Sequence, residues 1–462
     1  MARLVRAKEI SPVELIQAHL QQIEKWNSRL NAFVSMDETV VRKAKDAETA
    51  VMQSEGTLGP LHGIPVSIKS SIDVVGLKCE TGTRLRKDYV ASQDAPLVAR
   101  LKNAGAIVLG TTNVPEFLMA YETDNGLYGR TNSIWDVTRT AGGSSGGEAA
   151  AISAFCSSAG IGSDGGGSIR VPAHFSGICG LKPTPGRIPG TGHFPACAGP
   201  FALLGVVGPM ARTIADLQLL FKVIAGPDNG DPCSAPVPVQ NLTEAEVRKT
   251  RIGFFEHDGR TPVTAETRQA VRTAAESLRE EGFDVTEFRP DGLERARQLW
   301  WVLFVRGGAH VLRQAYKDRE SEMSSILEEF LQFSANDLPL SADDLFKTLF
   351  ERDELRTRFL DQMNRFPILI CPVSANPAFR HREREWLIEG QKVKYLDAVS
   401  YTQWFNLLGN PAAVVPVGRS PEGLPIGVQV VGRPYEEELV LEIAAVIERT
   451  CGGWRPPTLL TE

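Results

Sequence analysis

The chain has 462 residues, of which 42% are hydrophobic and 23% are charged. This is an ordinary globular mixture that can bury a large core, and a formal net charge of −6 argues against a nucleic-acid partner. No apolar run is long enough to span a bilayer, and the N-terminus lacks the apolar stretch of a signal peptide, so we expect a cytoplasmic protein without membrane association.

Cysteine and histidine spacing bears on metal binding. Seven cysteines lie far apart without a C-x-x-C pair, and the seven histidines show neither H-x-x-x-H nor H-E-x-x-H spacing. Zinc sites normally bring such ligands close together in the sequence, and an odd number of cysteines does not suit a disulfide framework. We therefore expect no metal site.

The first half of the chain alternates between helical and strand-like segments. A capping box at residues 11–14, with proline at the first helical position, marks the start of a helix. The expected elements are helices to about residue 28, at 37–53 and at 94–103, and buried strands at 63–69 and 106–110. This alternation predicts an α/β layer structure.

The second half continues the alternation around a charged helical segment. The expected elements are helices at 213–225, 264–281 and 436–449 and strands at 251–255, 283–288, 367–372, 412–417 and 426–432. Residues from about 292 to 364 are largely helical and more charged. We interpret this segment as a helical lid or cap inserted between strands.

Residues 140–180 are rich in Gly, Ser and Ala and carry few large side chains. Such a composition lets backbones approach closely and leaves amide groups free to face a cavity. A flexible linker is also rich in Gly and Ser. This segment is apolar as well and lies in the middle of the chain, which favours a buried loop over a linker.

Two glycine patterns in this segment suggest other chemistries. Residues 160–165 fit the dinucleotide-binding pattern G-x-G-x-x-G, but Pro172 interrupts the helix that should follow. Residues 142–146 fit G-x-S-x-G, the nucleophile elbow of α/β-hydrolases, but residues 135–140 before it make a poor buried strand. Histidines do follow in the chain, so the second interpretation stays open.

A lysine and two serines offer a third chemistry. A serine hydroxyl is a weak nucleophile at neutral pH and needs a base. Lysine can be that base only as a neutral amine, which burial favours. Lys69 follows the apolar residues 64–68, which would place it in the core. Taken alone, however, a lysine at the end of a strand more often extends to solvent.

Several segments, in a fixed order, resemble the amidase signature family. They are GIPVSIK at 63–69, TNVPEF at 112–117, YGRTN at 128–132, GGSSGGEAA at 142–150, GSDGGGSIRVPA at 162–173, GICGLKPT at 177–184 and GLPIGVQVVGRP at 423–434. The resemblance covers nearly the whole chain and is weakest from about 235 to 365. It implies one α/β/α domain over residues 1–462, with a central mixed, twisted sheet covered by helices and a variable helical insertion at 292–364.

The resemblance also implies a catalytic triad and a mechanism. Ser168 would attack the carbonyl carbon, and Ser144 would take its proton and pass it to neutral Lys69. Water would then hydrolyse the acyl-enzyme, and no cofactor would be needed. The peptide bond between Gly143 and Ser144 is typically cis in this family.

The same resemblance assigns roles to the glycine run. The oxyanion hole would consist of the backbone amides of Gly165, Gly166, Gly167 and Ser168. Asp164 and Arg170 would pin the ends of the run. Position 165 departs from the family pattern, where Thr or Ile is common, and this glycine puts the stiffness of the loop in doubt.

Two serines next to the triad have open or altered roles. Ser145 either supports Ser168 or the lysine by hydrogen bonding, or caps the helix that follows it. Ser70 follows the lysine where the family commonly has an acidic residue. The loss of that charge should favour a neutral Lys69.

Residues of the substrate pocket are predicted by position alone. Met119, Tyr121 and residues 193–204, which include Phe194, fall where the family builds its pocket, and Trp300, Trp301, Trp404 and Phe405 are candidates for further aromatic walls. Each can equally belong to the core. If these residues line a pocket, it favours aryl or alkyl amides, and esters and carbamates (urethanes) share the same carbonyl.

We therefore predict an amidase that acts on carbon–nitrogen bonds other than peptide bonds, in a small-molecule amide, ester or carbamate. It would work as a monomer or homodimer. The alternative is the glutaminase subunit of a tRNA-dependent glutamine amidotransferase, although residues 401–405 are bulkier than expected for that subunit. A catalytically silent binding protein is a third interpretation, which the presence of all three triad residues disfavours.

Overall fold

A mixed sheet of eleven strands runs through the described part of the protein, a computed structural model that covers residues 1–53 and 58–460. The strand order is β1-β3-β2-β4-β6-β5-β12-β13-β9-β7-β8. The strands are β1 (Phe33–Met36), β2 (Pro65–Lys69), β3 (Ile107–Thr112), β4 (Ala159–Asp164), β5 (Cys179–Lys182), β6 (Val206–Ala211), β7 (Arg251–Phe254), β8 (Asp284–Glu287), β9 (Ile368–Pro372), β12 (Ala412–Arg419) and β13 (Pro425–Val431).

Helices cover both faces of the sheet, which confirms the α/β/α prediction. Successive residues of β12 alternate between the two faces: Val415 packs in a cluster with residues of α7, α9 and α16, whereas Val414 packs with residues of α5 and α6. These helices are α5 (Gly146–Ser153), α6 (Arg170–Ser176), α7 (Ile214–Ile224), α9 (Ala265–Glu280) and α16 (Glu437–Cys451).

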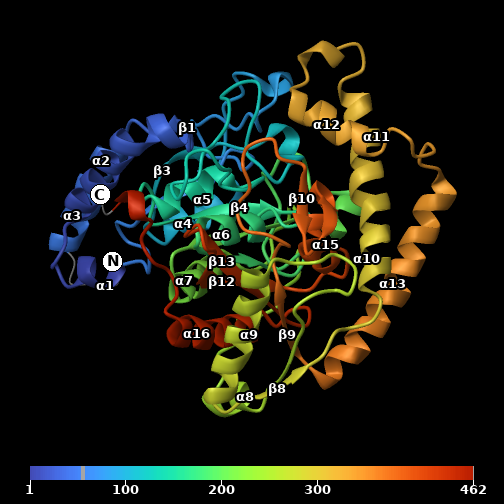
Figure 1. Ribbon diagram of the computed structural model, residues 1–462. Helices are drawn as coiled ribbons and strands as arrows, with labels where there is room; N and C mark the ends of the chain where they lie inside the picture. Colours follow the sequence, from blue (N-terminus) through green and yellow to red (C-terminus); the bar gives the residue numbers. More distant parts are fainter. Residues whose placement is uncertain (54–57, 461–462) are drawn as a thin grey trace.

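The N-terminal helices pack at one end of the sheet (Figure 1). Helix α2 (Pro12–Leu30) begins with the predicted capping box and ends at Asn31, which adopts the left-handed conformation. The other helices outside the insertion are α1 (Ala2–Arg6), α3 (Val40–Gln53), α4 (Pro96–Asn103), α8 (Glu244–Arg248), α14 (Tyr395–Ala398) and α15 (Ser400–Leu407). A separate hairpin consists of β10 (Glu385–Ile388) and β11 (Gln391–Lys394).

The segment predicted as a helical insertion is helical. It comprises α10 (Leu293–Trp300), the π-helical turn η4 (Trp301–Arg306), α11 (Gly307–Ala315), α12 (Ser325–Phe333) and α13 (Ala342–Arg365), which lie together along one side of the molecule (Figure 1). Helix α10 packs against α15. Of the helices in the described residues, none combines the length and apolar character needed to cross a membrane.

The topology brings two charged residues to one edge of the sheet. Strand β2 lies between β3 and β4 and is parallel to both. All residues of β2 and β4 are buried, as expected for strands with helices on both faces. Because the carboxyl ends of parallel strands meet at one edge, Lys69 at the end of β2 lies near Asp164 at the end of β4.

Candidate active site

Lys69 is completely buried among hydroxyl groups. Its Nζ lies 2.7 Å from Ser144 Oγ, 2.9 Å from Ser145 Oγ and 2.9 Å from Ser163 Oγ. Burial lowers the pKa of Lys69 to about 7, although the charge of Asp164 acts in the opposite direction. An amine with this pKa is partly neutral at neutral pH and can accept a proton from a neighbouring hydroxyl.

Ser145 supports the lysine and does not cap the helix that follows. Its Oγ contacts Lys69 Nζ and accepts a hydrogen bond of 3.3 Å from Ser163 N, and it makes no capping hydrogen bond to the first turn of α5. The capping interpretation is therefore wrong. The Ser145 backbone N–H also donates to the Ser168 carbonyl at 3.2 Å, which ties together the loops that carry Ser144 and Ser168.

Ser144 and Ser168 both line one cavity. The Gly143–Ser144 peptide bond is cis, as the family resemblance predicts. Among the described residues, no hydrogen bond joins Ser144 Oγ to Ser168 Oγ, and Ser168 Oγ has no other partner. The structure therefore links Lys69 directly to Ser144 and leaves the Ser168 hydroxyl free at the cavity wall.

The glycine run presents three free amides beside Ser168. The backbone N–H groups of Gly165, Gly166 and Ser168 donate to no acceptor in residues 1–53 and 58–460. The Gly167 N–H instead donates to Asp164 Oδ1 at 2.7 Å. The prediction that all four amides face the substrate is therefore wrong for Gly167, because the Asp164 carboxylate already occupies its N–H.

Side chains from one loop and two helices that are distant in sequence hold the carbonyl groups of the same run. Trp300 Nε1 donates to the Gly165 carbonyl at 3.0 Å. The Gly166 carbonyl accepts hydrogen bonds from Tyr121 Oη at 2.8 Å and from Thr402 Oγ1 at 2.6 Å. These contacts fix the orientation of the peptide planes, so the loop does not depend on a side chain at position 165 for its stiffness.

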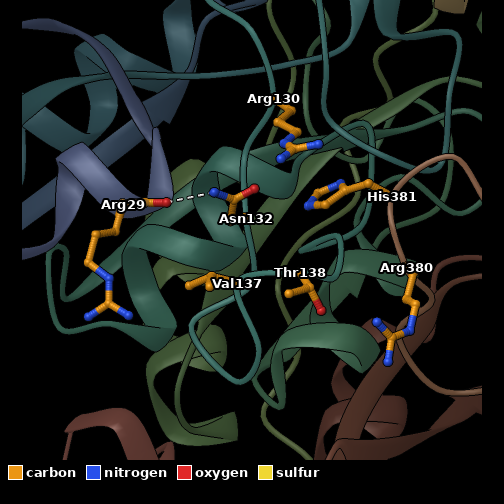
Figure 2. A pocket seen from close by; sticks show the side chains of 7 residues that line it. All are labelled: Arg29, Arg130, Asn132, Val137, Thr138, Arg380 and His381. Atoms are coloured by element: carbon orange, nitrogen blue, oxygen red, sulfur yellow. Dashed lines mark hydrogen bonds between the residues drawn. The ribbon is translucent and has the colours of Figure 1, made fainter.

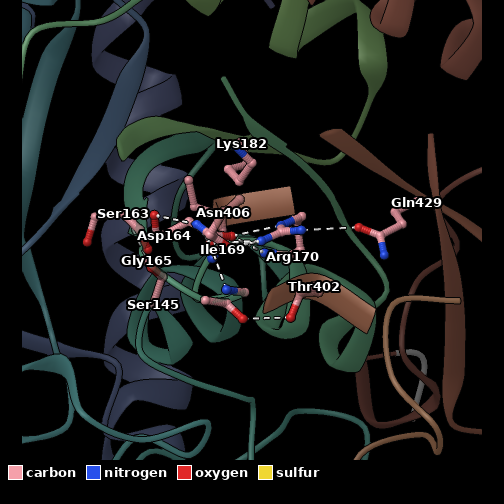
Figure 3. A network of polar contacts seen from close by, with 12 residues as sticks. Ser145, Ser163, Asp164, Gly165, Ile169, Arg170, Lys182, Thr402, Asn406 and Gln429 are labelled. Carbon is pink, nitrogen blue, oxygen red and sulfur yellow. Dashed lines mark hydrogen bonds and ion pairs between the residues drawn. The ribbon is translucent and has the colours of Figure 1, made fainter. Parts of the chain in front are cut away.

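Asp164 and Arg170 form a fully buried ion pair at the ends of the run (Figure 3). Arg170 Nε and Nη2 each lie 3.0 Å from a different oxygen of Asp164. Burial would raise the pKa of Asp164, but the Arg170 charge and the hydrogen bonds from Arg170 and Asn406 outweigh it and hold this pKa well below its usual range. Asp164 also accepts from Ile169 N, so the contacts expected of a loop clamp are present.

The cavity has a volume of about 720 Å³, within the usual range for small-molecule sites. Its walls are mainly apolar and come from both the glycine-rich half of the chain and the helical insertion. The larger apolar residues that line it are Leu85, Phe117, Leu118, Met119, Phe194, Phe201, Leu204, Phe304, Val311 and Leu312. The predicted pocket residues Met119 and Phe194 are among them.

Three predicted pocket residues lie elsewhere, which corrects the sequence analysis. Tyr121 lies behind the glycine run, where its hydroxyl binds the Gly166 carbonyl. Trp404 is completely buried and packs against Tyr401, with ring centroids 5.1 Å apart. Phe405 is likewise core and packs against Phe359.

The aromatic residue of the helical insertion that lines the cavity is not one of those that the sequence analysis predicted. Trp300 supports the glycine run, and Trp301 donates to Asp337 at 2.9 Å, whereas Phe304, one helical turn after Trp300, lines the cavity. Sequence reasoning also missed Ser163, whose hydroxyl contacts Lys69. Its only signal was its place beside Asp164 in the family motif. In the described residues, no group of His, Cys, Asp or Glu could hold a metal ion.

Comparisons with known proteins agree with this geometry. A family model described as Amidase matches residues 14–441. The chain is 33% identical to an indoleacetamide hydrolase of Bradyrhizobium diazoefficiens, over 98% of this chain and 86% of that protein. It is 34% identical to an acylamidase of Rhodococcus erythropolis, over 97% of this chain and 94% of that protein. A solved bacterial aryl acylamidase superposes with a TM-score of 0.84 at 27% identity, covering 97% of this chain and 95% of that one. The chain therefore belongs to the amidase signature family of hydrolases.

Proposed function

We propose that the protein hydrolyses the carbon–nitrogen bond of small amides that carry an aryl or alkyl group, through an acyl-enzyme on Ser168. One observation carries this proposal. The buried Lys69 amine contacts Ser144 Oγ at 2.7 Å, and Ser144 and Ser168 both line an apolar cavity.

In this mechanism, Ser168 Oγ attacks the substrate carbonyl while its proton passes to Ser144 Oγ, and the Ser144 proton passes to Lys69 Nζ. A rotation of the Ser168 side chain on substrate binding would close the remaining hydrogen bond, since such contacts often tighten only in the substrate complex. The free amides of Gly165, Gly166 and Ser168 would stabilise the oxyanion. The same relay would return a proton to the leaving amine, and water would then release the acid by the reverse route.

The cavity supports a bulky, apolar substrate. Its walls include the rings of Phe117, Phe194 and Phe304, which suit aromatic or alkyl groups. The names of the relatives, an indoleacetamide hydrolase and an acylamidase, agree with that substrate class. Esters and carbamates present the same acyl carbonyl, and we propose that they are cleaved as well.

The glutaminase alternative fits the cavity less well. Glutamine carries a charged ammonium and a charged carboxylate that need partners when buried. The Asp164 carboxylate in the cavity wall is already paired with Arg170. The Arg86 guanidinium, which also lines the cavity, is likewise engaged, because it lies over the rings of Tyr89 and Phe194, 3.8 and 4.0 Å from their centroids. We therefore propose a stand-alone hydrolase of apolar amides.

The test combines turnover with location of the nucleophile. Purified protein is screened against anilides, aliphatic amides, esters, carbamates and glutamine, and the serine that displaces fluoride from a fluorophosphonate is identified by mass spectrometry of the phosphonyl adduct. We expect turnover of the apolar amides, an adduct on Ser168, and loss of both in Lys69→Ala.

A histidine variant separates this mechanism from the nucleophile-elbow alternative. His193 lines the cavity, and His193→Gln should still form the adduct because no histidine takes part in the relay. An adduct on Ser144, or loss of labelling in His193→Gln with an unchanged melting temperature, would overturn the proposal.

A further inference from the structure

A second pocket lies apart from the cavity that Ser168 lines, and the two share no lining residue. It has a volume of about 530 Å³. Its lining consists of Arg29 at the end of α2, residues of the loop before α5, and residues that follow β9 along the chain: Arg29, Arg130, Asn132, Val137, Thr138, Arg380 and His381. Figure 2 shows the Arg130 guanidinium and the His381 ring directed toward the space beside Asn132, with Arg29 and Arg380 on opposite sides.

Three arginines that line the pocket lack a carboxylate partner. Arg29, Arg130 and Arg380 are exposed, and none of them forms an ion pair within the part of the chain that the structure describes. Nearby arginines on the same segments behave differently, because each pairs with an acidic residue: Arg139, Arg382 and Arg384. An anion in the pocket would therefore supply a partner for guanidinium groups that have none among the described residues.

Two buried polar atoms in the pocket lack a hydrogen-bond partner. The His381 side chain is only 7% exposed, and its Nδ1 lies 3.8 Å from Glu122 Oε2. Its Nε2 has no partner among the described residues, and neither has Asn132 Oδ1, although Asn132 Nδ2 donates to the Arg29 carbonyl at 2.7 Å. Leaving such an atom unpaired costs about 1–3 kcal/mol, so native structures normally supply a partner.

The missing partners define the chemistry of a ligand. Guanidinium groups bind phosphate oxygens in a bidentate manner. Asn132 Oδ1 can only accept a hydrogen bond, so the ligand must also carry a donor, such as the hydroxyl of hydrogen phosphate or of a sugar. The volume exceeds that of one phosphate ion and leaves room for a small organic body against Val137 and Thr138.

We propose that this pocket binds a small phosphate-bearing anion, either hydrogen phosphate or a phosphate monoester. Its oxygens contact the guanidinium groups of Arg130 and Arg380. A movement of the His381 and Asn132 side chains, whose Nε2 and Oδ1 atoms are buried in this structure, then lets the anion bond to these two atoms. A nucleic acid is disfavoured as the source of the phosphate, because the chain as a whole has a net charge of −6.

Inorganic phosphate is the probe for the test, with isothermal titration calorimetry at constant ionic strength and chloride as the balancing anion. We expect saturable binding to the wild type. The double variant Arg130→Ala/Arg380→Ala should weaken it at least about tenfold, because two charge-assisted contacts are lost. The matched control Arg42→Ala/Arg358→Ala removes the same charge from exposed arginines outside the pocket and should bind phosphate like the wild type.

A second variant of the same size tests the polar wall of the pocket. Asn132→Asp adds a negative charge beside the arginines and should abolish phosphate binding. Because it also removes the Nδ2 donor to the Arg29 carbonyl, its melting temperature is measured in chloride and binding is compared at a temperature at which both proteins are folded. The proposal fails if the wild type shows no saturable binding, or if either pocket variant binds phosphate as the wild type does. Equal weakening in the control double variant would indicate an adventitious ion only.

Glucose 6-phosphate and a short phosphorylated RNA then distinguish the sources of the phosphate group. Tighter binding of the monoester than of inorganic phosphate, lost in Asn132→Asp, is the expected result. Preferential binding of the RNA would contradict the assignment to a small molecule.

Discussion

The contact between Gly165 and Phe304 gives the sharpest test of how the insertion controls the glycine run. A Cβ added at Gly165 would lie 2.8 Å from Phe304 Cε2, well inside normal carbon–carbon contact of about 3.5–4.0 Å. The Phe304 ring stacks on Trp300 with centroids 4.7 Å apart and meets the edge of Phe330, so it can yield only toward the cavity that it lines. Gly165→Ala should therefore displace the run or push the ring into the cavity.

The expected loss follows from the cost of overpacking. Inserting a methyl group into a packed site costs about 1–3 kcal/mol, which corresponds to roughly a 5- to 150-fold fall in kcat/KM if the displacement misplaces the oxyanion donors. In a Phe304→Ala background the methyl group has room, so Gly165→Ala should then change kcat/KM by less than about twofold.

The assay is a double-mutant cycle of kcat/KM with an anilide substrate. Gly126→Ala is the matched control, because a Cβ there meets nothing closer than 3.8 Å. The same loss from Gly165→Ala in both backgrounds would refute the reasoning. It would mean that backbone freedom at position 165, and not contact with Phe304, sets the activity.

Three further predictions concern the lysine, the buried ion pair and the cavity. Because burial lowers the pKa of Lys69 to about 7 and the neutral amine is the active form, kcat/KM should rise about tenfold from pH 6 to pH 8; a flat profile of the acylation rate would contradict this base. Asp164→Asn leaves the Arg170 charge buried and unpaired, so it should lower the free energy of unfolding by about 3–5 kcal/mol in urea titrations, whereas a loss below about 1 kcal/mol would argue against a desolvated pair. Phe194→Ala should raise KM for aryl amides several-fold, while Trp404→Phe should leave KM unchanged, since only the former lines the cavity; an equal effect of both would show that the cavity is not the binding site.

The sequence predicted the elements that have clear hydrophobic patterns and end signals. Helix α2 begins at its capping box, and the strands around Lys69 and residues 412–432 lie within a few residues of their expected bounds. It did not predict β4, β5 and β6, whose residues include several glycines and few β-branched side chains. These strands form because they lie between other buried strands, and such tertiary context is not visible in local sequence.

The same distinction, between features with a local sequence signal and features that depend on tertiary context, applies to the candidate site. The segments that carry Lys69, Ser144 and Ser168 were recognisable by their motifs, and the structure brings all three to one region. The pocket was harder to predict, because an aromatic residue on a helix faces either a cavity or the core, and local spacing does not distinguish the two. Trp404 faces the core, whereas Phe304, from the helical segment at 292–364, faces the cavity.

The Asp164–Arg170 pair has a consequence for the synthesis of the protein. Arg170 also contacts Asn406 and donates to Gln429 Oε1 at 3.2 Å, and these partners are translated more than two hundred residues after it. A nascent chain that still lacks them cannot complete the hydrogen-bonded shell around this guanidinium. The clamp on the glycine run should therefore reach its final form only after residue 429 has been synthesised and has left the ribosome.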